Sequence, residues 1–389
     1  MNKTTVVVAG GGFAGYTLIR YLAARAPGLE VILVDPREEA VFLPLLPDAV
    51  AGKVRLSRLL FPFPAFCRRH RSVFIRSRAA RLPGNRTLVL EDGCEIPFDY
   101  LVVSAGQEPN FYGNDRARAI AFTLAGPDDA RRLRARLEEV CRRGRGHTFL
   151  VVGGGYTGVE TASALVSAGR RMAGGEAPFR VRIAELAPRI LGNLPEIIAG
   201  PARREVARLG IEVSCSAGLE VSEGGGVTLD GETIPDLTLV WSAGMRPVDF
   251  VRKLDFPKDK QGRLRVGPDL SLPAAPHIFA LGDCASVAAG GVPLRMAVQF
   301  SWAEGTAAAR NIRRRIAGKP ALPYRPRDYG YLIPVASGKA WGEVLGARVG
   351  GSLGSVLHYF MCVYRTLSWE NKIGIIRDLI LKGSDGVME

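Results

Sequence analysis

The chain has 389 residues, of which 47% are hydrophobic and 23% charged, the balance of an ordinary globular protein of two or three domains. Its formal net charge of +14 is compatible with an anionic membrane leaflet or nucleic acid as a binding partner, or with no partner at all. The longest C-terminal apolar stretch, 353–364, is interrupted by His358 and is too short to span a bilayer, which takes ~20 residues. The six cysteines are scattered and form no C-x-x-C or C-x₄-C pair, which excludes a zinc ribbon and a local redox disulfide.

A glycine-rich turn follows the first apolar run. It reads Gly10-Gly11-Gly12-Phe13-Ala14-Gly15, and Asp35 closes the next apolar run at the spacing from which a carboxylate reaches an adenosine ribose. In a dinucleotide-binding turn the first glycine makes the tight exit from the strand and the second lets the pyrophosphate approach. The third lets the helix pack closely. We therefore predict a dinucleotide site that uses Gly10, Gly12, Phe13, Ala14, Gly15 and Asp35.

Basic residues gather in two runs. Ten Lys or Arg and no acid lie within 53–86, and seven arginines against two glutamates lie within 131–145. The arginines of these runs do not alternate with a stacking platform for bases, so a membrane is a better partner than nucleic acid. The first strand begins by Thr5, which leaves no room for a secretory signal and predicts a cytoplasmic protein.

A second glycine turn follows a later apolar run. It reads Gly153-Gly154-Gly155-Tyr156-Thr157-Gly158, and Glu185 closes the next apolar run, farther beyond Gly158 than Asp35 lies beyond Gly15. We attribute the additional length to a loop over 170–178. The expected contacts are Gly153, Gly155, Tyr156, Gly158 and Glu185. Two such turns predict two dinucleotides brought together so that electrons pass between them.

The order of the remaining signals predicts an α/β protein with two Rossmann-like domains. Each half has a late strand that ends in a small-residue turn, Ala105-Gly106 and Ala243-Gly244. A further strand over 276–281 ends in Gly282-Asp283, and a helix follows over 297–317. We expect a first dinucleotide-binding domain that is interrupted by the second, with both sheets parallel, and a small C-terminal domain. The expected boundaries are 1–118 with 250–319, then 119–249, and then 320–389.

The C-terminal domain is expected to begin with a small antiparallel unit and to end in two helices. Residues alternate over 330–335 and 339–344, and apolar residues then recur at three- and four-residue spacing over 353–367 and 373–381. Three uses of these apolar faces stay open. They are packing on the protein's own core, docking in the plane of a membrane, and dimerisation.

These motifs, in this order, resemble the two-dinucleotide-binding flavoproteins, and within them the type II NADH dehydrogenases, single-subunit NADH:quinone oxidoreductases that pump no protons. The resemblance covers nearly the whole chain. Besides the two turns it rests on the segments 42–52, 101–113 and 124–134, and more loosely on the tail after 353. No cysteine lies within 1–66, where members that reduce disulfides, peroxide or coenzyme A carry their reactive sulfur, so that chemistry is not expected.

The resemblance implies FAD at the first turn and NADH as co-substrate at the second. Asp283 would hold the flavin ribityl hydroxyls, although an N-cap role is the alternative. Glu160 would face the contact between nicotinamide and flavin, its charge stabilised by the helix end; the alternative is an ordinary surface glutamate. The remaining cofactor contacts that the resemblance implies are Pro44, Ala105, Gly106, Val298, Ala243 and Gly244.

One departure concerns the acceptor side. The family's helix commonly carries Ala-Gln and then a Gln-Gln pair before a glycine, whereas this chain has Val298-Gln299 and then Ala303-Glu304-Gly305. Gln299 and Glu304 are catalytic candidates for the reaction with quinone. Glu304 is either an exposed helix residue or a buried acid whose raised pKa lets it supply a proton.

The expected function is therefore hydride transfer from NADH to flavin and two-electron transfer to a membrane quinone. The expected location is peripheral, on the cytoplasmic face of a membrane, with a homodimer left open. One alternative is a soluble NADH-dependent reductase of a ferredoxin-type partner. Others are a sulfide:quinone oxidoreductase, for which paired reactive cysteines are missing, and a redox-sensing or nucleic-acid-binding module.

Overall fold

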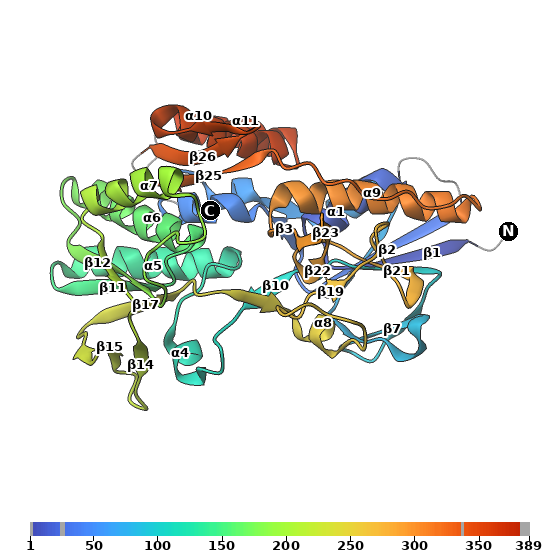
Figure 1. Ribbon diagram of the computed structural model, residues 1–389, viewed down its shortest axis with the longest axis horizontal. Coiled ribbons are helices and arrows are strands. Elements are labelled where there is room, and N and C mark those ends of the chain that lie inside the picture. Colours follow the sequence, from blue (N-terminus) through green and yellow to red (C-terminus); the bar gives the residue numbers. More distant parts are fainter. Residues whose placement is uncertain (1–2, 24–27, 336–337, 382–389) are drawn as a thin grey trace. The chain divides into compact units, whose positions relative to one another are not determined.

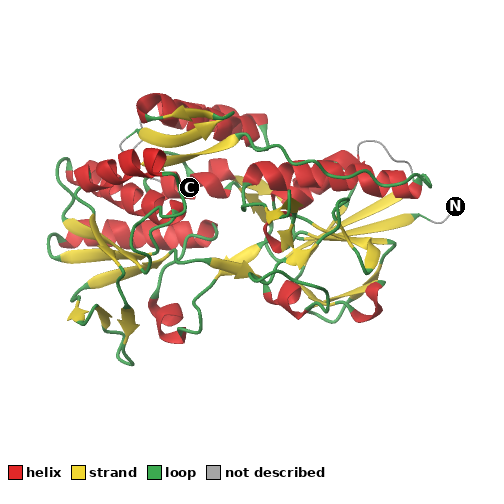
Figure 2. Ribbon diagram, in the orientation of Figure 1, coloured by secondary structure: helices red, strands yellow, loops and turns green. Residues whose placement is uncertain are grey.

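The computed structural model describes residues 3–23, 28–335 and 338–381, and these form two compact units. Unit 1 comprises 1–40, 61–108 and 245–328, and unit 2 comprises 41–60, 109–244 and 329–389. Each unit contains one glycine turn, one wholly or mostly parallel sheet and its own buried core. Figures 1 and 2 show helices packed against a sheet in each unit.

Unit 1 is built on a six-stranded sheet whose central strands are parallel. Val6, Val7 and Val8 of its central strand are fully buried, because helices or loops cover both faces of a parallel sheet. In spatial order the strands are β20 (Ser271–Leu272), β21 (Ala275–Ala280), β9 (Tyr100–Val103), β1 (Thr4–Ala9), β2 (Leu29–Asp35) and β5 (Val73–Arg76). Only β20 runs antiparallel to its neighbour.

Two helices of unit 1 pack tightly on each other beside this sheet. They are α1 (Phe13–Ala23) and α9 (Val298–Ile316). A Cβ at Gly305 of α9 would lie 2.4 Å from the backbone oxygen of Ala14, so this position requires glycine. Shorter elements complete the unit: α3 (Phe63–Arg69), α8 (Asp249–Lys253), the antiparallel sheet of β6 (Ala79–Arg81), β7 (Thr87–Leu90) and β8 (Glu95–Pro97), and the pairs β19 (Leu264–Arg265) with β22 (Ala285–Ser286) and β23 (Ala288–Ala289) with β24 (Val292–Pro293).

Unit 2 repeats the plan on a four-stranded parallel sheet. Its strands in spatial order are β13 (Glu212–Cys215), β12 (Phe179–Glu185), β11 (His147–Val152) and β17 (Leu237–Trp241). Every residue of β11 is buried, as expected of the central strand. The helices are α2 (Leu46–Val50), α4 (Asp115–Ile120), α5 (Pro127–Arg143), α6 (Tyr156–Ala173) and α7 (Glu196–Arg208), and a small antiparallel sheet contains β14 (Leu219–Val221), β15 (Val227–Leu229) and β16 (Glu232–Thr233).

The C-terminal part of unit 2 forms a layer over α6 and α7 (Figure 1). It contains the expected antiparallel unit, β25 (Gly330–Val335), β26 (Lys339–Val344) and β27 (Ala347–Val349), followed by α10 (Gly351–Arg365) and α11 (Trp369–Ile380). Lys339 Nζ donates to Glu205 Oε2 of α7 at 3.0 Å, and α10 packs on the other side of β25 and β26. No helix within the described residues is long and apolar enough to cross a membrane.

One sequence expectation differs from the structure. Residues 170–173, expected in a loop over 170–178, belong to the last turn of α6. The helix ends only at Gly174, whose φ of 64° gives the left-handed cap. The two contact-defined units also group 41–60 and 329–389 with the second turn, so the three expected domain boundaries stay a prediction.

Candidate functional site

The first glycine turn connects β1 to α1 in unit 1, and two of its glycines are fixed by close backbone contacts. Gly10 has a φ of 106°, and a Cβ there would lie 2.3 Å from the Ser104 oxygen. A Cβ at Gly15 would lie 2.1 Å from the Gly10 oxygen. These contacts bring α1 close to β1, and the Ser104 hydroxyl secures the turn by donating to the Gly10 oxygen at 2.7 Å.

The second glycine of this turn borders open space. A Cβ at Gly12 would meet nothing within 4 Å, and the helix begins directly afterwards with Phe13 and Ala14. The first N–H groups of a helix have no partner inside the helix and carry partial positive charge. The turn therefore fits a pyrophosphate at the N-terminus of α1.

Asp35 orients this turn from the end of β2. Its Oδ2 accepts from the Gly11 N–H at 2.8 Å, and its Oδ1 accepts from the Arg37 N–H at 2.9 Å and from Arg37 Nε at 3.0 Å. The residue is 1% exposed. The backbone thus holds the carboxylate beside the dinucleotide turn, and Arg37 is a partner that sequence reasoning missed.

A second part of unit 1 converges on the same helix end. Gly282 has a φ of 68°, and a Cβ there would lie 3.5 Å from the Ala14 side chain. Asp283 follows, and burial raises the pKa of its carboxyl. Gln107 Nε2 donates to the Asp283 backbone oxygen at 2.8 Å. Asp283 therefore lies close to the N-terminus of α1, where a ligand bound at the first turn would continue.

Glu304 is a buried acid, so the alternative of an exposed helix residue is wrong. The residue is 3% exposed, and its Oε2 accepts from the Gly282 N–H at 2.6 Å. Burial is the main cause that raises the pKa of Glu304 to about 7, and the neighbouring Asp283 adds to it. A glutamate in this position can gain or lose a proton near neutrality.

Gln299 lies on the same helix but has a different partner. Its Nε2 donates to Asp328 Oδ1 at 2.9 Å, and Arg295 pairs with the same carboxylate at 2.5 Å. Glu304 and Gln299 therefore point to different parts of unit 1. Val298 is the first residue of α9 and is partly exposed beside them.

The second glycine turn has the same geometry in unit 2. Gly153 has a φ of 104°, a Cβ there would lie 2.6 Å from the Ser242 oxygen, and one at Gly158 would lie 1.8 Å from the Gly153 oxygen. A Cβ at Gly155 would meet nothing within 4 Å. This turn also fits a pyrophosphate at a helix N-terminus, that of α6.

Glu185 takes the place of Asp35 at this turn. Its Oε2 accepts from the Gly154 N–H at 2.6 Å, and its Oε1 accepts from the Ala187 N–H at 2.7 Å. The carboxylate is thus fixed by two backbone donors at the end of β12. Tyr156, the first residue of α6, packs edge-to-face on Tyr331 of β25 with ring centroids 5.9 Å apart.

The small-residue turn after β17 is covered by a tyrosine that sequence reasoning missed. The Tyr112 hydroxyl donates to the Ala243 oxygen at 3.2 Å, and a Cβ at Gly244 would lie 2.4 Å from that hydroxyl. In unit 1 the matching small residues, Ala105 and Gly106, are partly exposed after β9. The repeated Ser-Ala-Gly, 104–106 and 242–244, is the sequence signal that relates these two turns.

Glu160 lies in the first turns of α6, and its surroundings reverse the expected effect on its charge. Burial and the charge of Asp48 raise the pKa of Glu160 well above its ordinary value, whereas the helix end was expected to stabilise the ionised form. Desolvation and a nearby like charge both disfavour the ionised carboxylate. Pro44, another residue of the expected site, lies four residues before Asp48 in a short 3₁₀ helix (Leu43–Leu45) of unit 2.

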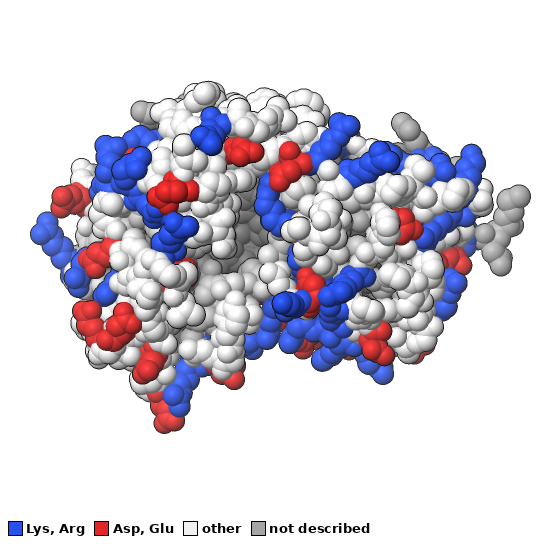
Figure 3. Space-filling model, viewed as in Figure 1, with Lys and Arg blue, Asp and Glu red and all other residues white. Residues whose placement is uncertain are grey.

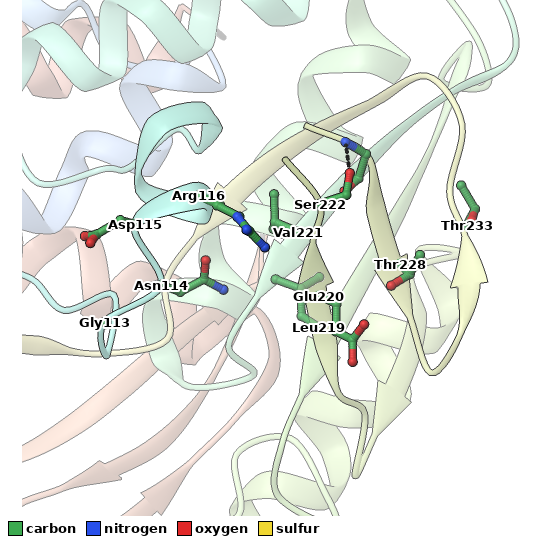
Figure 4. Close-up of a pocket in the computed structure, with 11 residues that line it drawn as sticks. Gly113, Asn114, Asp115, Arg116, Leu219, Glu220, Val221, Ser222, Thr228 and Thr233 are labelled. Carbon is green, nitrogen blue, oxygen red and sulfur yellow. Dashed lines mark hydrogen bonds between the residues drawn. The ribbon is translucent and has the colours of Figure 1, made fainter. Parts of the chain in front are cut away.

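A pocket of about 770 Å³ lies in unit 2 apart from the glycine turn (Figure 4). It is formed by the start of α4 and by the small sheet of β14, β15 and β16. Its lining combines polar residues such as Arg116, Glu220 and Thr228 with the apolar Leu219 and Val221. None of the candidate site residues is among its lining residues.

Two glycine turns with anchored acids on two parallel sheets define an α/β oxidoreductase with two dinucleotide sites. The sequence model of the pyridine nucleotide-disulphide oxidoreductases matches residues 4–310, and the chain belongs to this family.

Similar proteins extend the comparison over the whole chain. A demethylphylloquinone reductase of Synechocystis is 27% identical over 96% of this chain and 95% of its own length. A type II NADH:quinone oxidoreductase of Mycobacterium tuberculosis is 26% identical over 96% of this chain and 86% of its own. The solved structure of NDH2 from Plasmodium falciparum in complex with NADH has a TM-score of 0.85 at 14% identity, covers 97% of this chain and 98% of its own, and shows the shared fold.

Proposed function

We propose that this chain is an NADH:quinone oxidoreductase that uses FAD and pumps no protons. The observation that carries the proposal is the pair of glycine turns, each with one glycine facing open space and an acid held by the turn's backbone. FAD belongs at the turn of unit 1, where Asp283 lies, and NADH at the turn of unit 2. The names of the full-length relatives from Synechocystis and M. tuberculosis support quinone as the acceptor.

In this proposal the chain's own residues bind and orient the two dinucleotides, and the flavin supplies the redox chemistry when bound. Gly12 and Gly155 leave room for the two pyrophosphates, and Glu185 accepts from the adenosine ribose of NADH. The overall reaction converts NADH, a proton and quinone into NAD⁺ and hydroquinone. In this proposal Glu304, whose pKa burial raises to about 7, exchanges a proton near neutrality.

The proposed location is the cytoplasmic face of a membrane, with α10 and α11 lying in the interface. Large apolar side chains are exposed along both helices, which fits an interfacial helix better than a buried one. They are Leu353, Val356, Phe360, Tyr364, Trp369, Ile373, Ile376 and Ile380, each between 44% and 78% exposed. Figure 3 shows few charged side chains on the visible surface over these helices.

The basic runs contribute less to membrane binding than their composition suggests. Five arginines of α5 pair with acids three or four residues away on the same helix, Arg131, Arg132, Arg134, Arg136 and Arg143. In the other run, Arg68, Arg69 and Arg71 are exposed on unit 1. The proposal therefore assigns the main attachment to the apolar side chains and a smaller part to anionic lipid.

The experiment is anaerobic reduction of the holoprotein by NADH, followed by mixing with a water-soluble quinone, a ferredoxin or oxygen. The proposal is supported if NADH bleaches the flavin and if, among the three acceptors, only quinone restores the oxidised flavin absorbance rapidly. Fast recovery only with ferredoxin would instead favour the soluble reductase. No bleaching by NADH would reject both.

A further inference from the structure

An exposed aromatic side chain lies against the turn that follows β17 in unit 2. The Tyr112 hydroxyl donates to the Ala243 oxygen of this turn at 3.2 Å, and the residue is 68% exposed. Its neighbour Phe111 is buried and stacks on Trp241, the last residue of β17, with ring centroids 4.9 Å apart. Of two adjacent aromatic residues, one therefore belongs to the core of unit 2, and the other faces solvent beside the candidate site.

The backbone that carries Tyr112 is held in an unusual conformation. Tyr112 has a φ of 51°, a left-handed value that is uncommon for a bulky residue and persists only where the surroundings enforce it. Asn110 enforces it here, because its Oδ1 accepts from the Tyr112 N–H at 3.0 Å. The Asn110 N–H in turn donates to the Gly244 oxygen at 3.0 Å, and the Asn110 backbone oxygen accepts from Trp241 Nε1 at 2.8 Å. Contacts within the protein thus fix Tyr112 to this turn.

The fold itself does not require a tyrosine at this place. The sequence Ser-Ala-Gly occurs at the matching turns of both units, 104–106 and 242–244. A Cβ at Gly106 would meet nothing within 4 Å, whereas a Cβ at Gly244 would lie 2.4 Å from the Tyr112 hydroxyl. The same backbone turn therefore forms in unit 1 without an aromatic cover, which favours a role for Tyr112 in binding.

The order of the strands indicates which half of a dinucleotide lies at Tyr112. Glu185 ends β12, Gly153 follows β11 and Ala243 follows β17, and these strands are adjacent in that order. A dinucleotide crosses the carboxyl ends of such strands with its pyrophosphate at the glycine turn and its adenosine ribose at the acid. The adenosine half is therefore expected over β12 and the nicotinamide half over β17. A Cβ at Gly153 would lie 2.8 Å from the Ala243 Cα, so the glycine turn and the turn beneath Tyr112 are in contact.

We propose that Tyr112 is a binding residue for the nicotinamide half of NADH, with its ring packed on that half and its hydroxyl holding the ring against Ala243. This inference rests on the proposed function, which assigns NADH to the second glycine turn. An aromatic side chain whose position is already fixed loses little conformational freedom on binding. Its exposed ring also offers a planar apolar surface to a planar heterocycle.

Binding of NAD⁺ and of ADP to the holoprotein, measured by titration calorimetry, tests the proposal without turnover. ADP contains the adenosine ribose and the pyrophosphate and lacks the nicotinamide half. Tyr112→Ala should raise the Kd of NAD⁺ roughly tenfold, as removal of an aromatic stacking partner typically does, and leave the Kd of ADP within about twofold. Tyr112→Phe keeps the ring and loses one hydrogen bond, so it should bind NAD⁺ within about threefold of the native protein.

Leu345→Ala is the matched control. It removes another large side chain that is 74% exposed, from a backbone with a similar φ of 53°, in the hairpin between β26 and β27 of unit 2. This variant should bind both ligands like the native protein. If Tyr112→Ala does not fold, Tyr112→Asn takes its place, because asparagine also lacks the ring and adopts a positive φ more readily.

Three results would overturn the proposal. The first is a Tyr112→Ala protein that binds NAD⁺ as tightly as the native protein. The second is an equal loss for NAD⁺ and ADP, which would indicate a general disturbance of the turn. The third is a Tyr112→Phe protein that loses as much affinity as Tyr112→Ala, since the ring would then not be the contact. A native holoprotein that binds neither ligand would instead reject the NADH site of the proposed function, and this inference with it.

Discussion

The backbone N–H of Gly154 donates to Glu185 Oε2 at 2.6 Å, and this bond fixes a carboxylate beside the second dinucleotide turn. The bond between Gly11 and Asp35 at 2.8 Å repeats it at the first turn. In both units the residue between the tight-turn glycine and the open glycine orients the acid at the end of the next strand. The acid's position is therefore set before any nucleotide arrives, which reduces the cost of ordering it on binding.

Coenzyme preference is the first prediction. A fixed Glu185 carboxylate should accept hydrogen bonds from the ribose hydroxyls of NADH and repel the 2′-phosphate of NADPH. Together these two effects should favour NADH by about 2–3 kcal/mol, or roughly 30–150-fold in kcat/KM. Glu185→Gln should lose most of that ratio, and Glu223→Gln, at an exposed ion pair elsewhere in unit 2, should keep it. Equal kcat/KM for the two coenzymes in the native protein would show that Glu185 does not select.

Flavin retention is the second prediction. Gly12→Val places a side chain in the open space of the first turn without touching the protein, so the variant should fold and be colourless. Gly15→Val meets the Gly10 oxygen instead and should lower the stability by at least about 2 kcal/mol. Gly175→Val, at another glycine with no neighbour within 4 Å, is the control. Absorbance and Tm measure both effects, and a fully yellow Gly12→Val protein would mean that the first turn is misassigned.

Membrane binding is the third prediction. Deleting the tail from Gly351 onward would also uncover β26, on which α10 packs, so single substitutions give the cleaner test. Phe360→Ser and Ile373→Ser together should greatly weaken sedimentation with anionic vesicles and leave NADH oxidation by soluble acceptors unchanged. Leu186→Ser, at an 80% exposed apolar residue elsewhere in unit 2, should bind like the native protein. If the native protein does not sediment with vesicles at low salt, or if it dimerises through this face, the membrane-docking hypothesis is wrong.

Stability against pH is the fourth prediction, and it concerns Glu304. The folded-state pKa of about 7 lies above the ordinary value of 4.5, so the folded protein binds more protons than the unfolded chain between these values. Stability from this group is therefore present at low pH and is lost as the pH rises through about 7, by on the order of 2–3 kcal/mol. Glu304→Gln should flatten the decline in Tm from about pH 5 to about pH 8. If the Tm of Glu304→Gln falls with rising pH as much as that of the native protein, another group causes the decline.

The same variant tests whether Glu304 takes part in the reaction. Flavin reduction by NADH should be unchanged, because the nicotinamide site belongs to the other glycine turn. Reoxidation by quinone should be slower or should shift in its pH dependence, since a neutral amide cannot exchange the proton. Glu205→Gln, at a buried glutamate paired with Lys339, is the matched control. Quinone kinetics that are unaltered across this pH range would remove Glu304 from the mechanism.

The fold could be predicted from sequence wherever the signal was local. The glycine turns, their acids and the two terminal helices depend on spacing within a short stretch of sequence, and these elements were placed correctly. The continuation of α6 to Ala173 was missed because the residues before Gly174 are compatible with both a helix and a loop, and only the cap decides.

The electrostatics of the site could not be predicted, because they depend on contacts between distant segments. Asp48 and Tyr359 are 311 residues apart in sequence, and nothing in either local pattern indicates that they meet. The Gly282 N–H that donates to Glu304 Oε2 lies 22 residues away in sequence. For Glu160 the position at a helix start can be read from the sequence, whereas the burial and the neighbouring Asp48 that raise its pKa cannot.

The central claim is that NADH reduces a flavin in this chain and that quinone takes the electrons. Stopped-flow absorbance of the anaerobic holoprotein tests it most directly. We predict rapid loss of the oxidised flavin spectrum with NADH, and recovery on mixing with a water-soluble quinone much faster than with oxygen or ferredoxin. A flavin that NADH does not reduce, or a reduced flavin that quinone does not reoxidise, would contradict it.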